Sequence, residues 1–414
     1  MTQHIIIAGA GVVGLALAWQ LARAGGRVTI IDPEDPASGA SYGNAGALSQ
    51  GSVAPLAMPG VLKQVPGMLT DPRGALRIPP AVLPRVLPWL WRFVASAKPA
   101  RVLEIAEALQ ALQGNAIDHH RMMLAEEGAL DLLRENGQLQ LYRDEAGFAK
   151  DAGSFSLRRR FGHRFEILRG AALAEFQPGI APEYRLGVLL PDQGSSTNPQ
   201  RHALTFLRGA QRMGATLQRG RVQSIITEGG RATGVMTDAG PLAADHVVLA
   251  AGMWSAALLR PLGYRIPLES QRGYHVMIPD AGVTLERPVV ASDRKAFLSP
   301  MEGGLRVAGT VEFGGLKRPP DPRRAQYLLE DVQRVFPAAR IENAQPFWMG
   351  HRPCLPDSLP VVGPVARLPG LWCAFGHGHL GLTSSAPTGA VLARAILGPA
   401  PNIDLAPFAP ERFA

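Results

Sequence analysis

Three glycines near the N-terminus have a spacing that suits phosphate binding. Gly9, Gly11 and Gly14 form a G-x-G-x-x-G motif between an apolar run at 5–8 and a helical pattern at 12–24. The first glycine allows a tight turn, the second lets the backbone approach a pyrophosphate, and the third lets the helix pack closely on the strand. The helix N-terminus would present free N–H groups to the phosphates. A βαβ unit that uses its glycines for packing alone is the alternative.

An acidic residue extends this pattern towards a dinucleotide. Asp32 ends a second continuous apolar run at 27–32, 18 residues after Gly14. A carboxylate there would accept hydrogen bonds from the ribose of an adenosine. It would also repel the 2′-phosphate of NADP, so the pattern favours NAD or FAD. The predicted cofactor contacts of this region are Gly9, Gly11, Val12, Val13, Gly14 and Asp32.

A long segment of small residues follows Asp32. Residues 33–48 replace the helix that a nicotinamide-binding Rossmann domain normally has there. Backbone amides and the side chains of Ser41 and Asn44 could follow an extended cofactor from its pyrophosphate to its ring, although a plain flexible loop would have the same composition. The predicted contacts are Pro33, Ser41, Asn44, Ala45, Gly46, Ala47 and Leu48.

A further candidate region lies in the middle of the chain. Residues 233–237 are typical of a strand, 238–240 of a hairpin turn and 244–251 of a strand buried on both faces, and Gly252 opens a helix. Small residues at the carboxyl end of such a strand let a ligand cross the sheet edge, the usual binding site in open α/β sheets. The predicted contacts are Val222, Ala250, Ala251, Gly252 and Trp254.

A second helix N-terminus near the end of the chain favours a flavin. Residues 371–375 predict a strand, 376–381 a glycine-rich turn and 382–397 a helix. If this helix pointed at the N1–C2=O edge of an isoalloxazine, its dipole would stabilise the charge that develops on reduction. A nicotinamide enzyme needs no such device, so FAD fits best. The predicted contacts are Gly376, Gly378, His379, Leu380, Gly381, Leu382 and Thr383.

In this order the segments resemble the D-amino-acid oxidase superfamily of FAD enzymes, and within it the bacterial D-amino-acid dehydrogenases of the small-subunit type. The resemblance covers nearly the whole chain. It implies an enzyme on the cytoplasmic side that oxidises the Cα–N bond of an amino acid, and members of this group often pass electrons to a membrane quinone rather than to oxygen. The matching stretches are GAGVVG (9–14), SYGNAGALSQGSVAPLAMPG (41–60), ADHVVLAAGMWS (244–255), QRGYHVMIP (271–279), GHRPCLPDSLPVVGP (350–364) and FGHGHLGLTSSAPTG (375–389).

The resemblance also implies a residue for the substrate carboxylate. Arg352 matches the arginine that grips this group in the family, and a guanidinium is the best bidentate partner for a carboxylate. A structural arginine is the alternative. Arg272 and Tyr274 lie two apart on a predicted strand and so share one face. Tyr274 could donate to the same carboxylate, but core packing of both residues is an open alternative.

Three further residues complete the candidate catalytic set. His377 matches a family position beside the ring, whereas the position of His379 varies in the family and leaves its role open. Ser49 and Gln50 end the loop that should pass the flavin, so either could touch the substrate or cap the loop. No metal is expected, since neither the adjacent histidines His119 and His120 nor the cysteines have ligand spacing.

The predicted reaction requires no strong protein base. An amino acid bound with a neutral amine can lose its Cα hydrogen as hydride to flavin N5 while the nitrogen lone pair forms the imine. D-Proline or a D-hydroxyproline is one substrate option. A glycine- or sarcosine-type oxidase that uses oxygen and a non-catalytic subunit that only holds FAD are the alternatives.

The fold class expected is α/β (α+β), with a Rossmann-like FAD-binding domain and an interleaved substrate domain on a mixed or antiparallel sheet. Chains of 414 residues usually form more than one domain. Because the cofactor segments are dispersed, we expect a discontinuous FAD-binding domain at 1–60, 190–266 and 348–414. The substrate-binding domain would comprise 61–189 and 267–347.

The charge and cysteine content restrict partners and location. There are 42 basic and 34 acidic residues, a net charge of +8, but the two tight basic clusters, 157–160 and 321–324, are typical of solvated surface. Nucleic acid binding is therefore not expected. Two cysteines fit a reducing compartment, so we expect a cytoplasmic protein. The sequence leaves the oligomeric state open.

One proline- and tryptophan-rich stretch suggests a membrane contact. Residues 78–98 carry Trp89 and Trp91 with flanking basic residues, while prolines and arginines exclude a membrane-spanning helix. Such a stretch suits peripheral contact with the inner face of a membrane, near a quinone acceptor. A buried helix of the substrate domain is the equal alternative.

Overall fold

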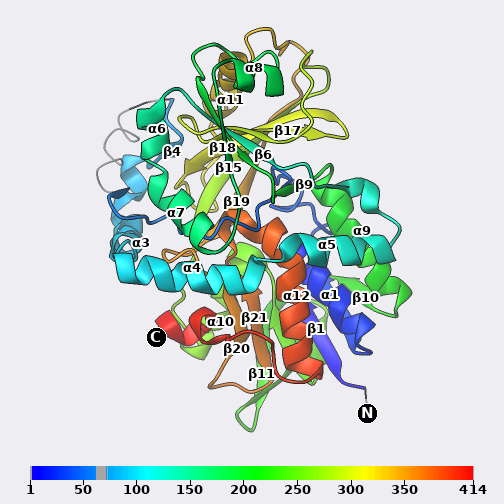
Figure 1. Ribbon diagram of the computed structural model, residues 1–414. Coiled ribbons are helices and arrows are strands. Elements are labelled where there is room, and N and C mark those ends of the chain that lie inside the picture. Colours follow the sequence, from blue (N-terminus) through cyan, green and yellow to red (C-terminus); the bar gives the residue numbers. More distant parts are fainter. Residues whose placement is uncertain (1, 62–70, 72, 414) are drawn as a thin grey trace.

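The structure is a computed structural model that describes residues 2–61, 71 and 73–413 (Figure 1). Residues 62–70 and 72, which the expected substrate-binding domain includes, lie outside the described residues. Figure 1 shows one sheet region in the lower half, beside the N-terminus, and another in the upper half. Helices lie around and between them.

The lower sheet is the expected parallel sheet. The apolar strands HIIIA and RVTIID are almost entirely buried, as strands covered on both faces must be. All neighbours run parallel except the last pair, which is antiparallel. The strand order is β10 (Thr216–Arg219), β2 (Arg27–Asp32), β1 (His4–Ala8), β14 (His246–Leu249), β21 (Leu371–Phe375) and β20 (Val361–Pro364).

Helices cover one face of this sheet and a small antiparallel sheet covers the other. The elements are α1 (Val12–Arg23), α9 (Pro199–Arg212) and α12 (Gly381–Leu397), and on the opposite face β11 (Val222–Glu228), β12 (Arg231–Thr237) and β13 (Gly240–Ala243). Ile5 and Ile7 of β1 pack with the helices, whereas Ile6 packs with β12 and β14. Gly389 lets α12 approach α1 closely, because a Cβ there would lie 2.9 Å from the Ala16 carbonyl oxygen.

The prediction for the middle segment was partly wrong. The turn at 238–240 does not lead directly into a long buried strand; residues 240–243 form β13, the hairpin partner of β12. The chain then crosses to the parallel sheet at Asp245, whose Oδ2 accepts a 2.7 Å hydrogen bond from the His4 amide. Only 246–249 form the buried strand beside β1. The small and apolar residues of 240–249 look alike in the sequence, so they did not reveal that the chain leaves the small sheet and enters the parallel sheet within this segment.

The upper sheet is mostly antiparallel, as expected. Its only parallel pairs among the described residues are β16 (Val289–Ala291) with β6 (Gln138–Tyr142) and β18 (Gly304–Glu312) with a short edge strand, β4 (Leu76–Arg77). Its strands run in the order β19 (Trp348–Cys354), β15 (Glu269–Ile278), β18 (Gly304–Glu312), β17 (Ala296–Met301), β16 (Val289–Ala291), β6 (Gln138–Tyr142), β8 (Leu186–Leu190) and β7 (Glu166–Arg169).

The remaining elements connect and cover the two sheets. No helix among the described residues has the length and apolar content needed to cross a membrane. A small sheet contains β3 (Ala47–Leu48), β9 (Gly194–Ser196) and β5 (Leu133–Arg134), and the helices are α3 (Leu83–Ala95), α4 (Pro99–Gln113), α5 (Ala116–Glu126), α6 (Glu145–Ala149), α7 (Ala152–Arg160), α8 (Ala171–Phe176), α10 (Ser255–Leu259) and α11 (Arg323–Val335).

Two segments differ from the expected domain boundaries. Strand β19 pairs with β15 in the upper sheet, so 348–354 extends the substrate side rather than the FAD-binding side. Helices α4 and α5 pack on α12 and bury Ile105, Leu109 and Ile117 in the core that also contains β1. Their apolar faces thus belong to the lower core although their sequence lies within 61–189. The other boundaries stay predictions.

Candidate functional site

A cavity of about 1670 Å³ lies between the two sheets. The carboxyl ends of β1, β2 and β14 form its lower wall, and β15, β17, β18 and β19 contribute its upper wall. The predicted cofactor contacts that line it are Gly9, Gly11, Val12, Val13, Asp32, Pro33, Ser41, Asn44, Ala45, Ala47, Val222, Ala250, Ala251, Gly252, Trp254, Gly376, Gly378, His379, Leu380, Gly381, Leu382 and Thr383.

The three glycines of the N-terminal motif do different things. Gly9 has a φ of +119°, and a Cβ there would collide with the Ala250 carbonyl group. Gly14 faces the Gly9 carbonyl oxygen, where a Cβ would also collide, so it serves packing and does not line the cavity. Gly11 faces open space at the start of α1, and its nearest neighbour would be Ser41 Oγ at 3.6 Å. The open position beside a helix N-terminus suits a phosphate.

Asp32 organises the edge of the sheet next to this position. Its Oδ2 accepts a hydrogen bond from the Ala10 amide at 2.7 Å, and its Oδ1 accepts one from the Glu34 amide at 2.9 Å. Each carboxylate oxygen can accept a second bond, and Asp32 lines the cavity. The arrangement therefore leaves acceptors for ribose hydroxyls. Ser41 Oγ accepts the Val12 amide at 2.9 Å and so ties the long loop to α1.

An arginine from the upper sheet fixes the middle of this loop. Arg306 of β18 donates to the carbonyl oxygens of Tyr42 at 2.9 Å and Asn44 at 2.6 Å. Burial lowers the pKa of Arg306 to about 10, so it remains charged at neutral pH. Asn44 Oδ1 accepts the Gly46 amide at 2.8 Å, which closes a local turn. The loop is thus clamped rather than freely flexible, and nothing in its local sequence predicts the contact with Arg306.

The end of the loop is joined to the first turn of α12. The Ser49 amide donates to Thr383 Oγ1 at 3.0 Å, and Thr383 Oγ1 donates to the Ala47 carbonyl oxygen at 3.3 Å. Ser49 Oγ donates to Gln138 Oε1 at 3.3 Å. The first-turn amides of a helix have no intrahelical partner, so this corner of the cavity offers donors to a bound group.

Two buried histidines support the same turn. The carbonyl oxygens of Leu382 and Thr383 lie 3.0 and 3.2 Å from His120 Nε2 and can only accept, so this nitrogen carries the proton. His120 Nδ1 then accepts from His202 Nε2 at 2.9 Å, and His202 Nδ1 accepts from Ser196 Oγ at 3.1 Å. Burial lowers the pKa of His120 to about 4. A neutral, directional chain therefore holds the start of α12.

Arg352 lies where a substrate carboxylate could reach it. Its Nη1 donates to the Thr310 carbonyl oxygen at 2.8 Å and its Nη2 to that of Gly309 at 3.4 Å. No acidic side chain pairs with it among the described residues, and it lines the cavity. Gly273 lets the guanidinium lie against β15, because a Cβ there would collide with it. A half-buried cation with only carbonyl partners favours an anionic ligand.

The histidines around this arginine are poor bases. His377 Nε2 lies 3.0 Å from Thr388 Oγ1, and burial lowers the pKa of His377 to about 3. Desolvation and then the charge of Arg352 lower the pKa of His379 to about 4. His351 lines the cavity, and its Nδ1 lies 2.8 Å from Ser270 Oγ. Burial, followed by the charge of Arg272, lowers the pKa of His351 as well.

Three predicted substrate contacts lie elsewhere. Arg272 and Tyr274 do share a face of β15, but it is the face away from the cavity. There Tyr274 Oη donates to Glu312 Oε2 at 2.7 Å, and Arg272 Nε lies 3.7 Å from the same oxygen. Gln50 Oε1 accepts a hydrogen bond from the Ile117 amide at 3.2 Å, at the start of α5. Gln50 thus has the capping role that was the alternative to substrate contact. Nearly all of β15 is buried, so burial could not distinguish its faces.

Some predicted cofactor contacts are also displaced from the cavity. Gly46 packs against the Ser196 carbonyl group with a φ of +77°, and Leu48 is fully buried in the lower core. Both lie between residues that do line the cavity, namely Ala45, Ala47 and Ser49. The roles of the remaining predicted residues stay predictions.

The cavity has lining residues that sequence analysis missed. They come from the upper sheet and belong to segments distant in sequence: Gln138, Gln271, Gly273, Thr310, Trp348 and His351. The indole of Trp348 lies against Gly43 and Gly350, where a Cβ would collide with it. It also stacks on His275, with ring centroids 5.2 Å apart. In the sequence, the available signal for Trp348 was the pair of glycines, Gly43 and Gly350, that make room for its ring.

The donors and acceptors of the cavity fit FAD. One end has a helix N-terminus, an open glycine and a carboxylate for the pyrophosphate and ribose. The other has the first turn of α12, joined to Ser49 and Thr383. Within the described residues, no group of three or more His, Cys, Asp or Glu side chains could hold a metal ion.

Comparisons with known proteins agree with this geometry. Residues 4–395 match the DAO family model, described as FAD dependent oxidoreductase. A D-amino-acid oxidase of Bradyrhizobium diazoefficiens is 38% identical over 99% of both chains. The D-amino acid dehydrogenase 2 of Ralstonia nicotianae is 34% identical over 99% of this chain and all of the relative. The fold is similar to that of an L-proline dehydrogenase from P. horikoshii, with a TM-score of 0.78 and 19% identity over 100% of this chain and 98% of the other.

The family match spans most of the chain and both ends of the cavity. The expected fold class and enzyme class are thereby confirmed. The chain belongs to the DAO family of FAD-dependent oxidoreductases, and FAD is its cofactor.

Proposed function

We propose that this enzyme oxidises the Cα–N bond of a D-amino acid to an imine, which water then hydrolyses to a keto acid and ammonia. The observation that carries the proposal is Arg352, a cation without an acidic partner among the described residues, in the cavity that fits FAD. Relatives over the full chain are named D-amino-acid oxidase and D-amino acid dehydrogenase.

The chain would orient the substrate by its carboxylate. Arg352 would bind it bidentately while its guanidinium stays fixed by the carbonyl oxygens of Thr310 and Gly309. The Arg352 guanidinium lies against Gly273, which restricts rotation of the arginine side chain. The substrate Cα is therefore positioned with little further loss of entropy. FAD supplies the acceptor for the Cα hydrogen and its two electrons.

Proton removal would not depend on a side-chain base. His377 and His379 have pKa values of about 3 and 4 and are therefore neutral and weakly basic at neutral pH. The substrate amine would have to lose its proton to solvent before reaction. We expect kcat/KM to rise with pH until the amine is neutral, without an inflection near pH 6.5 from these histidines.

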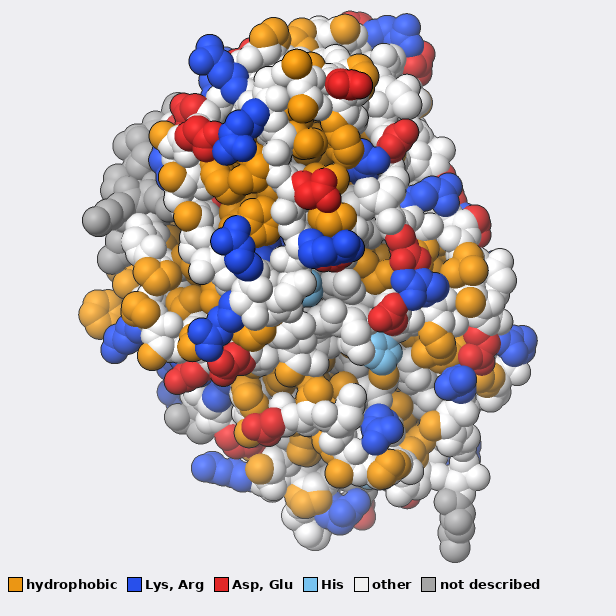
Figure 2. Space-filling view, in the orientation of Figure 1, with side chains coloured by type: hydrophobic (Ala, Val, Ile, Leu, Met, Phe, Trp, Pro, Cys, Tyr) orange, Lys and Arg blue, Asp and Glu red, His pale blue; other side chains and the backbone are white. Residues whose placement is uncertain are grey.

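The electron acceptor would be a quinone at a membrane surface. Helix α3 supplies Leu83 and Leu90 to the cavity, while Leu87 and Trp91 are 52% and 78% exposed. Leu83, Leu87 and Trp91 recur every four residues and so form one face of α3. Figure 2 shows hydrophobic side chains at this edge of the molecule with basic ones beside them. Arg92 and Lys98 are exposed nearby and would attract anionic lipid.

The acceptor assignment is tested by reoxidation. Enzyme reduced by substrate should be reoxidised rapidly by a soluble ubiquinone analogue and slowly by air. Fast reoxidation by air alone would assign the chain to the oxidases, as the name of the Bradyrhizobium relative suggests. D-Proline belongs in the substrate panel, because a cyclic amine would give a cyclic imine that remains intact.

The membrane contact is tested by co-sedimentation with vesicles that contain phosphatidylglycerol. The double variant Leu87→Asp/Trp91→Asp should remain in the supernatant, because it removes the apolar face of α3. Leu130→Asp, at an exposed leucine outside α3, is the matched control and should sediment as the wild type does. Equal sedimentation of both variants, or none of the wild type, would contradict the contact.

A further inference from the structure

The cavity extends well beyond Arg352 along the upper sheet. Ala308, Phe297, Val290 and Gln140 stand opposite one another on β18, β17, β16 and β6, and all four line the cavity. The Arg352 guanidinium contacts β18, so β6 lies three strand spacings away, about 14 Å. A substrate held at Arg352 therefore has room to extend towards β6.

A second buried arginine stands near that end. Arg158 of α7 is only 6% exposed and lines the cavity. Its Nη2 donates to Ser52 Oγ at 3.2 Å, and its Nη1 has no hydrogen-bond partner among the described residues. A buried guanidinium nitrogen without a partner is costly. Burial lowers the pKa of Arg158 to about 10, so the side chain stays charged at neutral pH.

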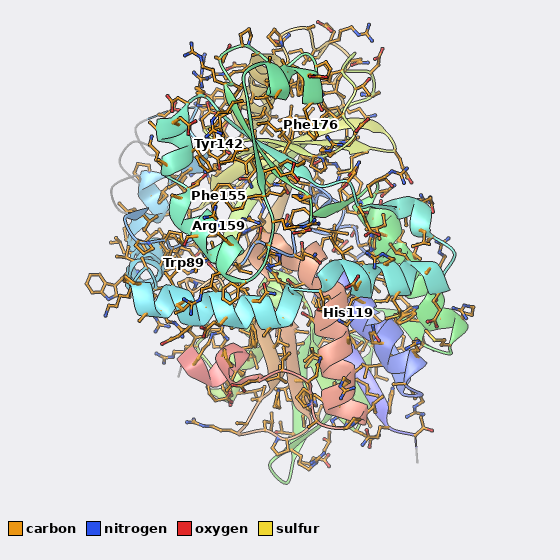
Figure 3. The ribbon with its side chains drawn as sticks, viewed as in Figure 1. Trp89, His119, Tyr142, Phe155, Arg159 and Phe176 are labelled. Carbon is orange, nitrogen blue, oxygen red and sulfur yellow. The ribbon has the colours of Figure 1, made fainter. Side chains whose placement is uncertain are left out.

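The neighbouring charges do not satisfy this arginine. Asp151 approaches it, but its Oδ2 accepts from Tyr142 Oη at 2.9 Å and lies 3.8 Å from Lys295 Nζ. Figure 3 labels Tyr142 and Phe155, which come from β6 and α7 and whose ring centroids are 6.5 Å apart. Arg158, Lys295 and Asp151 together leave this part of the cavity with net positive charge.

Ser52 connects the arginine to the region assigned to the flavin. It lies three residues after Ser49, whose amide binds Thr383 at the start of α12. The Ser52 carbonyl oxygen accepts from Gln113 Nε2 at 2.9 Å, which fixes the loop between the two sites. Arg158 thus lies in the same enclosed space as the flavin corner rather than on a separate surface.

We propose that Arg158 binds a carboxylate at the end of the substrate side chain, and that acidic D-amino acids such as D-glutamate are preferred substrates. This inference rests on the proposed function, because it assigns the α-carboxylate to Arg352. Arg158 is then the specificity-determining residue. The distance of about 14 Å from β18, which the Arg352 guanidinium contacts, to β6 leaves space in the cavity for two carboxylates joined by a short carbon chain.

The test compares D-glutamate with its neutral isostere D-glutamine in anaerobic flavin reduction. The wild type should show kcat/KM for D-glutamate at least about 30-fold above that for D-glutamine. Arg158→Met should remove this preference and leave D-glutamine within about threefold of wild type. Arg160→Met, at an exposed arginine on the same helix, is the control and should change neither value.

Binding of an unreactive ligand separates this inference from the proposed reaction. Glutarate should raise the melting temperature of the wild-type holoenzyme more than butyrate does, and Arg158→Met should respond to the two equally. If Arg158→Met does not fold, Arg158→Lys should retain part of the preference. D-Glutamine used as well as D-glutamate by the wild type would overturn the proposal, even though D-amino-acid oxidation itself would stand. Reduction by neither would also overturn it, and only a failure of every other D-amino acid as well would contradict the proposed function.

Discussion

The nucleotide end and the substrate end of the cavity are built in different ways. At the nucleotide end, His4 to Asp32 form one continuous strand, turn, helix and strand, and local sequence determines where each group lies. At the substrate end, Arg352, Gly273 and Thr310 come from separate strands and meet only through sheet pairing. The nucleotide end therefore tolerates few substitutions of its own residues. The substrate end depends instead on the register in which distant strands pair.

Gly14→Val should have the largest effect, because a Cβ at this position collides with the Gly9 carbonyl oxygen and separates α1 from β1. We expect the purified variant to contain no FAD and to be inactive, as measured by flavin absorbance per protein. Gly303→Val, in the turn between β17 and β18 and outside the cavity lining, is the control and should retain FAD, because a Cβ there would meet only the flexible end of Met277 at 3.4 Å. Full flavin content in Gly14→Val would show that the nucleotide end is less constrained than we infer.

Arg352→Met should reduce kcat/KM for a D-amino acid by about 10³-fold, mostly through KM, because it removes a charged partner in a half-buried site. Flavin content and melting temperature should stay close to wild type. Steady-state kinetics over a wide substrate range separate KM from kcat. Unchanged kcat and KM would show that Arg352 does not bind the substrate carboxylate.

Arg272→Met tests the opposite face of the same sheet. It removes the buried cationic neighbour of Glu312 and leaves that buried carboxylate with only the half-exposed Arg318, 3.9 Å away, so we expect the free energy of unfolding to fall by about 3 kcal/mol. Because Arg272 does not line the cavity, KM should change less than about threefold. Chemical denaturation and kinetics of one preparation give both values. A large rise in KM at unchanged stability would place Arg272 at the substrate after all.

The pH dependence of the histidine chain affects stability only in acid solution and should leave activity at neutral pH unchanged. The unfolded chain protonates His120 below about pH 6.5, whereas burial lowers its pKa in the fold to about 4. The free energy of unfolding should therefore fall as pH drops from 6.5 to 4, by about 3 kcal/mol for this residue. His120→Gln can keep both hydrogen bonds without titrating and should flatten the slope. His119→Gln, at the partly exposed neighbour labelled in Figure 3, should flatten it less.

The same difference explains what the sequence could predict. The sequence predicted the bounds of four elements, β1, α1, β2 and β21, to within a residue or two. Their apolar runs and the glycines that end them lie next to one another in the sequence. The sequence predicted that Arg272 and Tyr274 share a face but left open whether that face meets the substrate or the core, since β15 is buried on both sides and carries no alternation of polar and apolar residues. The pairing of β19 with β15 leaves no trace in local composition.

Basic clusters show the same limit. The run at 157–160 has the composition of solvated surface, and two of its arginines are indeed exposed. Arg158 is buried because α7 packs with that side against the loop after Ser49, where Ser52 accepts its hydrogen bond. Sequence spacing does not distinguish one arginine of such a run from the others. Only the tertiary structure shows that Arg158 lines the cavity.

Anaerobic mixing of the holoenzyme with D- and L-enantiomers of one amino acid tests the central claim most directly. With D-alanine or D-glutamate the visible flavin absorption band should disappear in the wild type, and much more slowly in Arg352→Met. The L-enantiomers should leave the band unchanged. A band that persists with every D-amino acid tried, or that L-enantiomers remove equally fast, would contradict the account.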